Sequence, residues 1–129
     1  MFTSLPARLA PYRWLILVLM VAAALRFHGI NWDQGQHLHP DERFLTMVTE
    51  SLKWPASPAE YMDEARSPLN PRNTGYSFFA YGVWPAVVVK AAAAALGLHS
   101  YDGITLVGRA ASSAADVATA LLLYFFGLT

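Results

Sequence analysis

Three apolar blocks separated by polar sequence are the feature that most constrains the fold of this 129-residue chain. The blocks cover Trp14–Leu25, Phe78–Leu98 and Ala110–Leu128, whereas residues 31–77 hold seven acidic and four basic side chains. Hydrophobic residues make up 55% of the chain, above the average for a soluble domain. Their segregation into blocks predicts an all-α, multi-pass transmembrane protein with one large polar loop.

The charge balance argues against a nucleic-acid-binding protein. The chain has nine basic and nine acidic residues, and the basic ones are not clustered. It contains no cysteine, which removes disulfide and thiolate chemistry. Nucleic acid is therefore not an expected partner. Membrane lipid is an expected partner, because of the apolar blocks.

The first apolar block predicts a membrane anchor over residues 1–30. Its apolar core is about 18 Å long as a helix, so it crosses the hydrocarbon layer only if Arg13 and Arg26 extend toward the headgroups. Arg8 and Arg13 favour a cytoplasmic N-terminus. The alternative is a cleaved signal peptide, with a basic start and a short apolar stretch. Both interpretations place residues 31–77 outside the cytoplasm.

The polar loop contains a predicted juxtamembrane helix. Pro40 suits the first turn, where its missing N–H costs nothing, and His39 then occupies the N-cap. Apolar residues recur at four-residue spacing from Phe44 to Leu52, which predicts an amphipathic helix of about fourteen residues along the membrane surface, ending before Pro55. An irregular loop with at most a short helical turn should follow, because it is rich in proline.

The remaining apolar blocks predict two further spans. Residues 78–98 make a helix of about 31 Å, with Lys90 either extending toward the inner headgroups or ending the span early. We expect a cytoplasmic turn at residues 99–107 and a third transmembrane helix, rich in small residues, at 108–129. Because this helix is still apolar at its end, we expect the chain to be the N-terminal part of a longer protein.

The richest chemistry lies in His37-Leu-His-Pro-Asp-Glu-Arg-Phe44. Asp41 and Glu42 are helix neighbours that project about 100° apart, so they suit two separate tasks, such as removing a proton and orienting a substrate. The structural alternative is that both only complement the helix dipole. His37 and His39, with these acids, also form a weak metal-ligand set for zinc or manganese, against the alternative of a solvated His37 and a capping His39.

Charged residues other than these acids and histidines are further candidates for a functional role. Arg43, Arg66 and Arg72 can bind a phosphate, or they can serve as surface charges. Asp116 lies within an apolar segment, where an acid is a functional candidate by default. Arg109 precedes it by two turns, so a local structural network is an equally good interpretation.

Several segments together resemble a known family. They are Leu25-Arg26-x-x-Gly29-Ile30, His39-Pro-Asp-Glu-Arg-Phe44, Ser67-Pro-Leu-Asn-Pro71, Tyr81-Gly82-x-x-Pro85, and Val107-Gly-Arg-Ala110 with Asp116. In this order they look like the first quarter of a bacterial lipid-carrier-dependent glycosyltransferase of the GT-C superfamily. Such enzymes are related to protein O-mannosyltransferases and to the aminoarabinose transferases that modify lipid A. The histidine-rich lead-in is not general to that superfamily.

The resemblance implies a function and a set of site residues. It implies transfer of a sugar, with inversion, from a polyprenyl-phosphate donor to an acceptor hydroxyl on a protein, lipid or glycan, at the bacterial plasma (inner) membrane. The resemblance makes Asp41 the base and Glu42 its support. His39, Arg43 and Arg72 are candidate substrate-binding residues on their own chemistry, not through the resemblance. A divalent metal stays open as a cofactor.

Two other classes of protein fit the same pattern. One is a small structural or assembly subunit whose acidic loop docks a partner. The other is a transporter fragment in which Asp116 and Lys90 line a pathway. The reading frame beyond Thr129 distinguishes them, because many further spans favour a transferase and a stop codon favours a small subunit. Without the missing helices, we expect the 129-residue piece to be inactive.

Overall fold

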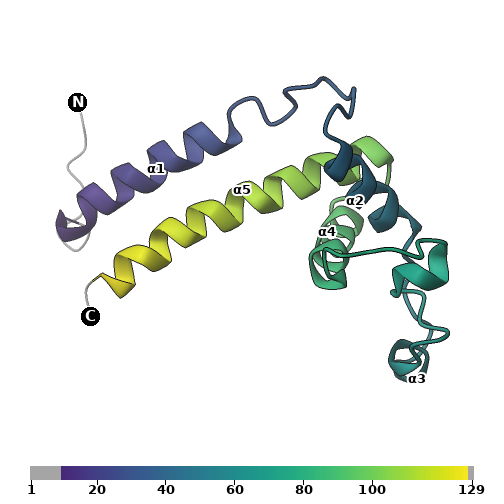
Figure 1. Cartoon of the computed structure of the whole chain (residues 1–129). Coiled ribbons are helices and arrows are strands. Elements are labelled where there is room, and N and C mark those ends of the chain that lie inside the picture. The colour runs from purple at the N-terminus through teal and green to yellow at the C-terminus, as the bar shows by residue number, and fades with distance from the viewer. Residues whose placement is uncertain (1–9, 128–129) are drawn as a thin grey trace. The chain divides into compact units, whose positions relative to one another are not determined.

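The computed structural model describes residues 10–127, in which every regular element is a helix (Figure 1). The chain divides into two compact units. The first, here called the helix pair, comprises residues 1–30 and 110–129, and the second, the central unit, comprises residues 31–109. The predicted all-α class is confirmed for the described residues. One helix, α5 (Tyr101–Phe126), is long and apolar enough to cross a membrane.

The helix pair consists of α1 (Arg13–Phe27), which follows the 3₁₀ turn η1 (Ala10–Tyr12), and the later part of α5. Of the predicted anchor, residues 1–9 lie outside the described part of the chain. No residue of α1 is buried, and only 6% of the most apolar window of α5 is buried. The apolar surface of α5 is therefore not covered as it is in the core helix of a soluble protein.

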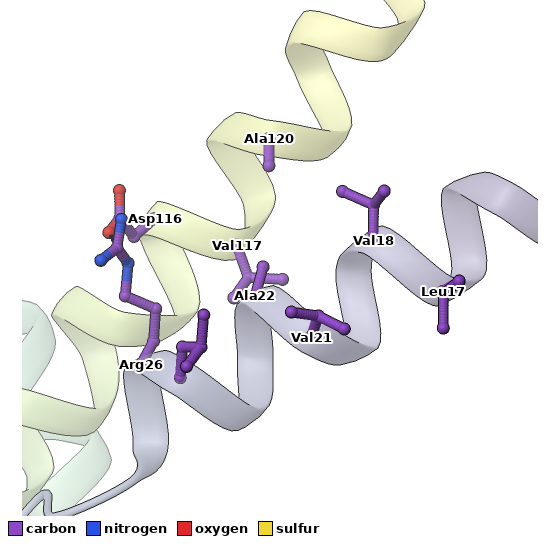
Figure 2. A pocket seen from close by; sticks show the side chains of 9 residues that line it. Leu17, Val18, Val21, Ala22, Arg26, Asp116, Val117 and Ala120 are labelled. Carbon is purple, nitrogen blue, oxygen red and sulfur yellow. Dashed lines mark ion pairs between the residues drawn. The ribbon is translucent and has the colours of Figure 1, made fainter.

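Asp116 of α5 forms an ion pair with Arg26 of the neighbouring helix α1 (Figure 2). The Ser113 hydroxyl also donates to the Arg26 carbonyl over 3.1 Å. A groove of about 460 Å³ lies between the two helices, lined mainly by aliphatic side chains. The acid in the apolar segment thus has a counter-charge on the neighbouring helix.

The central unit begins with α2 (Pro40–Ser51). As predicted, Pro40 lies in the first turn and His39 is the N-cap, its Nδ1 accepting the Glu42 N–H over 3.4 Å. The apolar stripe is also confirmed, because Val48 and Leu52 are fully buried. The stripe packs against protein, because Leu52 clusters with Ala86 and α2 packs along the helix that carries Ala86.

The loop after α2 is irregular, as predicted from its prolines. It contains the five-residue helix α3 (Pro58–Met62) and the 3₁₀ turn η2 (Pro71–Thr74). Thr74 shares a 2.9 Å hydrogen bond with Ser51, which ties η2 to the last residue of α2. The loop is thereby attached to the C-terminal end of that helix.

The second predicted span is shorter than expected. Helix α4 covers only Val83–Ala95 of the predicted 78–98 helix. It is about 20 Å long, which is shorter than the roughly 30 Å hydrocarbon layer. Gly82 and Gly97 adopt left-handed φ values of 78° and 70°, which end the helical geometry on each side. Lys90 is held within the central unit, because its Nζ donates to the Thr49 and Glu50 carbonyls at 3.2 and 3.3 Å.

The predicted turn at residues 99–107 is wrong, because α5 already begins at Tyr101. The Ser100 hydroxyl accepts the Gly103 N–H over 3.1 Å, as an N-cap does, and Asp102 lies in the first turn. The third predicted helix therefore starts seven residues earlier than 108. The later start was predicted because residues 99–103 are polar or small, whereas Gly108 and Arg109 directly precede the apolar block.

Segments predicted on opposite sides of the membrane contact each other in the central unit. His37 Nε2 lies 2.7 Å from Asp102 Oδ1, and the Tyr101 hydroxyl donates to the Arg43 carbonyl over 3.0 Å. A bilayer cannot lie between groups in hydrogen-bond contact. The predicted span at 78–98 and the cytoplasmic position of residues 99–107 are therefore inconsistent with this fold.

Two glycines of α5 give a matched test of the packing in the central unit. A Cβ on Gly103 would lie 3.0 Å from the Leu98 carbonyl oxygen and Cβ, whereas one on Gly108 would meet Val89 at 3.8 Å. We expect Gly103→Ala to lower the melting temperature, because a backbone atom cannot move aside easily. Gly108→Ala should be neutral or stabilising by up to about 1 kcal/mol, since alanine favours helix. Thermal melts by circular dichroism check both, and equal effects would contradict the packing.

Candidate functional site

The predicted acidic residues lie together at the N-terminus of α2, but in different environments. Asp41 and the flanking His39 and Arg43 are exposed, whereas Glu42 is partly buried. This difference follows from helix geometry, because neighbouring positions point to different faces. The two carboxylates are therefore not equally available to a substrate.

Glu42 belongs to an ion-pair network with Arg109 and Asp33, here called the arginine clamp. Arg109 donates through Nε and Nη2 to the two Glu42 oxygens at 2.5 and 2.9 Å. It donates through Nη1 and Nη2 to the two Asp33 oxygens at 3.0 and 2.7 Å. One guanidinium thus holds two carboxylates with paired hydrogen bonds, the strongest geometry for such contacts.

The clamp is largely shielded from solvent. The Asp33 side chain is 0% exposed, that of Arg109 11% and that of Glu42 24%. Asp33 also accepts the backbone N–H groups of Gly35 at 3.3 Å and Leu38 at 3.4 Å, and Trp32 lies against the guanidinium at 5.6 Å. The clamp thereby attaches the turn before α2 to both α2 and α5.

Sequence reasoning missed Asp33 as a partner. One signal pointed to it, because an arginine in an apolar helix requires a counter-charge. The chain offers several acids, however, and Asp33 is 76 positions away from Arg109. The sequence alone could not show which acid was the partner.

The clamp predicts an acid-sensitive fold. The hydrogen bonds and charge of Arg109 hold the pKa of Asp33 well below its usual range. Its stabilising contribution is therefore complete above the unfolded pKa of about 3.9 and is lost as the pH falls below that value. Melting temperatures measured from about pH 5 down to about pH 2 should fall more steeply for wild type than for Asp33→Asn. Parallel curves would contradict this contribution.

Asp41 lies beside an aromatic cluster. Burial, and then the adjacent Asp41 carboxylate, raise the pKa of Tyr81. The Tyr81 ring contacts those of Phe44 and Phe79 at centroid distances of 6.3 and 6.0 Å, and Phe44 also meets Tyr76 edge-on at 5.7 Å. An exposed carboxylate beside aromatic rings combines a proton acceptor with an apolar wall.

Arg72 is the third substrate-binding candidate, and within residues 10–127 it forms no ion pair or hydrogen bond with Asp41. It is exposed on η2, which Thr74 ties to Ser51 at the other end of α2. His39 and Arg43 flank the two acids in the chain, so the structure groups them with Asp41. Of the predicted set, only Arg72 comes from a separate element.

Each of the two histidines of the metal-ligand hypothesis has a partner within the protein. His37 is mostly buried, with its side chain 16% exposed, and it pairs with Asp102, so the expectation of a solvated His37 is wrong. The alternative of a capping His39 is confirmed. Within residues 10–127, no group of three or more histidine, cysteine or acidic residues could hold a metal ion.

No family model, curated protein or solved structure matches this chain. The chemistry of the site must therefore be derived from its own residues.

Proposed function

We propose that the complete protein is a membrane glycosyltransferase of the GT-C type, with Asp41 as its catalytic base. The observation that carries this assignment is the contrast between two adjacent acids. Glu42 is held by Arg109, whereas Asp41 is exposed at a helix N-terminus beside aromatic rings. This arrangement supplies one available carboxylate on a rigidly positioned helix, which is what general-base catalysis requires.

The proposed step is an inverting displacement. The Asp41 carboxylate accepts the proton of an acceptor hydroxyl on a protein, lipid or glycan. The hydroxyl oxygen forms a bond to the anomeric carbon as the bond from that carbon to the phosphate oxygen breaks. Polyprenyl phosphate leaves with the electron pair. Glu42 supports this step by fixing the helix turn that carries Asp41, through its bonds to Arg109.

Substrate contacts are assigned to the exposed groups near Asp41. Arg43 and His39 can hydrogen-bond the phosphate or the sugar, and Arg72 is the third cation proposed for this role. Tyr81 and the neighbouring rings offer an apolar wall to the sugar or the lipid. Each assignment is testable by a conservative substitution in the same transfer assay.

We place the protein in the bacterial plasma membrane through α1 and the later part of α5. In support of this, both helices expose large apolar side chains, and their charged residues Arg26 and Asp116 neutralise each other. The central unit is proposed to lie outside the cytoplasm as one body, with α4 as part of it. This topology replaces the three-span arrangement expected from hydropathy.

Cysteine labelling tests this topology in a chain that has no native cysteine. We expect a membrane-impermeant maleimide to label Gln36→Cys and His99→Cys in intact cells, but not Tyr12→Cys. Labelling of positions 36 and 99 from opposite sides would restore the earlier three-span topology. Labelling of both from the cytoplasm alone would overturn the glycosyltransferase assignment, because the lipid-linked donor is proposed to react outside.

The direct test of function is sugar transfer by membranes that contain the complete protein. Radiolabelled polyprenyl-phosphate sugars serve as donors, and membranes without the protein serve as the control. The transporter alternative has less support, because Lys90 binds carbonyls of α2 and Asp116 pairs with Arg26. Absence of transfer with every donor would leave an assembly subunit as the better assignment.

A further inference from the structure

A second pocket lies at the opposite end of α2 from Asp41. It has a volume of about 440 Å³ and is formed by the end of α2 and the residues after it, the second half of α4, and the start of α5 with the segment before it. Its lining includes three basic side chains, Lys53, Lys90 and His99, and one acid, Glu50. The two lysines alone outnumber the single acid, so the pocket favours an anion.

Lys90 gives the pocket a fixed cation. Its side chain is partly buried, and two of its hydrogen bonds go to the Thr49 and Glu50 carbonyls. A lysine ammonium has three N–H donors, so one remains for a ligand. Lys53 and His99 are exposed at the pocket and can close on the same anion. Lysine acts as a point charge and is a common phosphate binder.

The walls of the pocket are apolar. Leu52 and Ile104 line it, together with Trp54, whose exposed fraction is 51%. Leu96 and Leu98, near His99 in the chain, are 66% and 41% exposed. Basic groups beside exposed apolar side chains match an amphipathic ligand with an anionic head.

We propose that this pocket binds the phosphate of an anionic phospholipid headgroup. Glu50 is nine residues beyond Asp41 on α2, about 13 Å along the helix axis. A phosphate bound here is therefore not the leaving group at Asp41, and lipid binding is independent of the proposed transferase activity. The bound lipid would hold the central unit at an anionic membrane surface.

Calorimetric titration of the complete protein in nonionic detergent tests this site. The probes are dihexanoyl phosphatidylglycerol, dihexanoyl phosphatidylcholine and glycerol 3-phosphate. We expect saturable binding of phosphatidylglycerol, weakened about fivefold or more in Lys53→Gln/His99→Gln, because a lysine near an anionic lipid contributes about 1 kcal/mol and the His99 ring loses a hydrogen-bond donor. Both substituted side chains are exposed, so the fold should be retained, as circular dichroism can verify. Arg66→Gln is the matched control, since it removes an exposed charge outside the pocket.

Three results would overturn the assignment. Equal weakening by Arg66→Gln, or none by the double variant, would show diffuse surface electrostatics. Equal affinity for phosphatidylcholine would exclude recognition of the anionic head. Glycerol 3-phosphate binding as tightly as phosphatidylglycerol would make this a site for small phosphates, and Trp54→Ala would then leave both affinities unchanged.

Discussion

Replacing Asp41 by Asn in the complete protein is expected to reduce sugar transfer about 10²- to 10⁴-fold, the range for loss of a general base. The amide keeps the size of the side chain but cannot accept the proton of the acceptor hydroxyl. Folding should be unaffected, because Asp41 is exposed and forms no ion pair within residues 10–127. Initial rates with a radiolabelled donor measure the effect.

Glu64→Gln is the matched control for the Asp41 variant. Glu64 is also an exposed acid of the polar loop, but it lies far along the chain from α2 and its carboxylate has no role in the proposed site. Its rate should equal that of wild type. If Asp41→Asn also transfers sugar at the wild-type rate while expressing normally, Asp41 is not the base.

Replacing Arg109 by Met is expected to lower the melting temperature by about 10 °C or more, as for removal of one partner from a shielded ion pair. The substitution leaves the Asp33 carboxylate, which is 0% exposed, without its cation. It also releases Glu42 and thus the turn that carries Asp41. Circular dichroism melts of the purified protein measure the loss.

Two further variants make the Arg109 experiment specific. Arg66→Gln breaks an exposed pair with Asp63 and should change the melting temperature little, because such surface pairs contribute little. The combination Asp33→Asn/Glu42→Gln/Arg109→Met removes all three charges and should recover part of the loss. A single Arg109 variant as stable as wild type would mean that the clamp does not hold the central unit together.

The local features of α2 were predictable from neighbouring residues. Pro40 and His39 form the helix start, and the four-residue apolar spacing identifies the buried face, including Val48 and Leu52. These signals are readable because a cap or a helical stripe is decided within one or two turns of chain. The start of α5 was predicted wrongly at residue 108, although Ser100 is a local N-cap signal of the same kind.

The sequence by itself determined that the described chain is helical, where its apolar segments lie, and that two acids open α2. Only the tertiary structure decided that Arg109 selects Asp33 and Glu42, 76 and 67 positions away, and that Lys90 binds the end of α2. The reason is physical: hydropathy measures the affinity of a segment for an apolar surrounding, but lipid and a protein interior both provide one. Packing against α2 therefore assigns α4 to the central unit, which its composition could not distinguish from a membrane span.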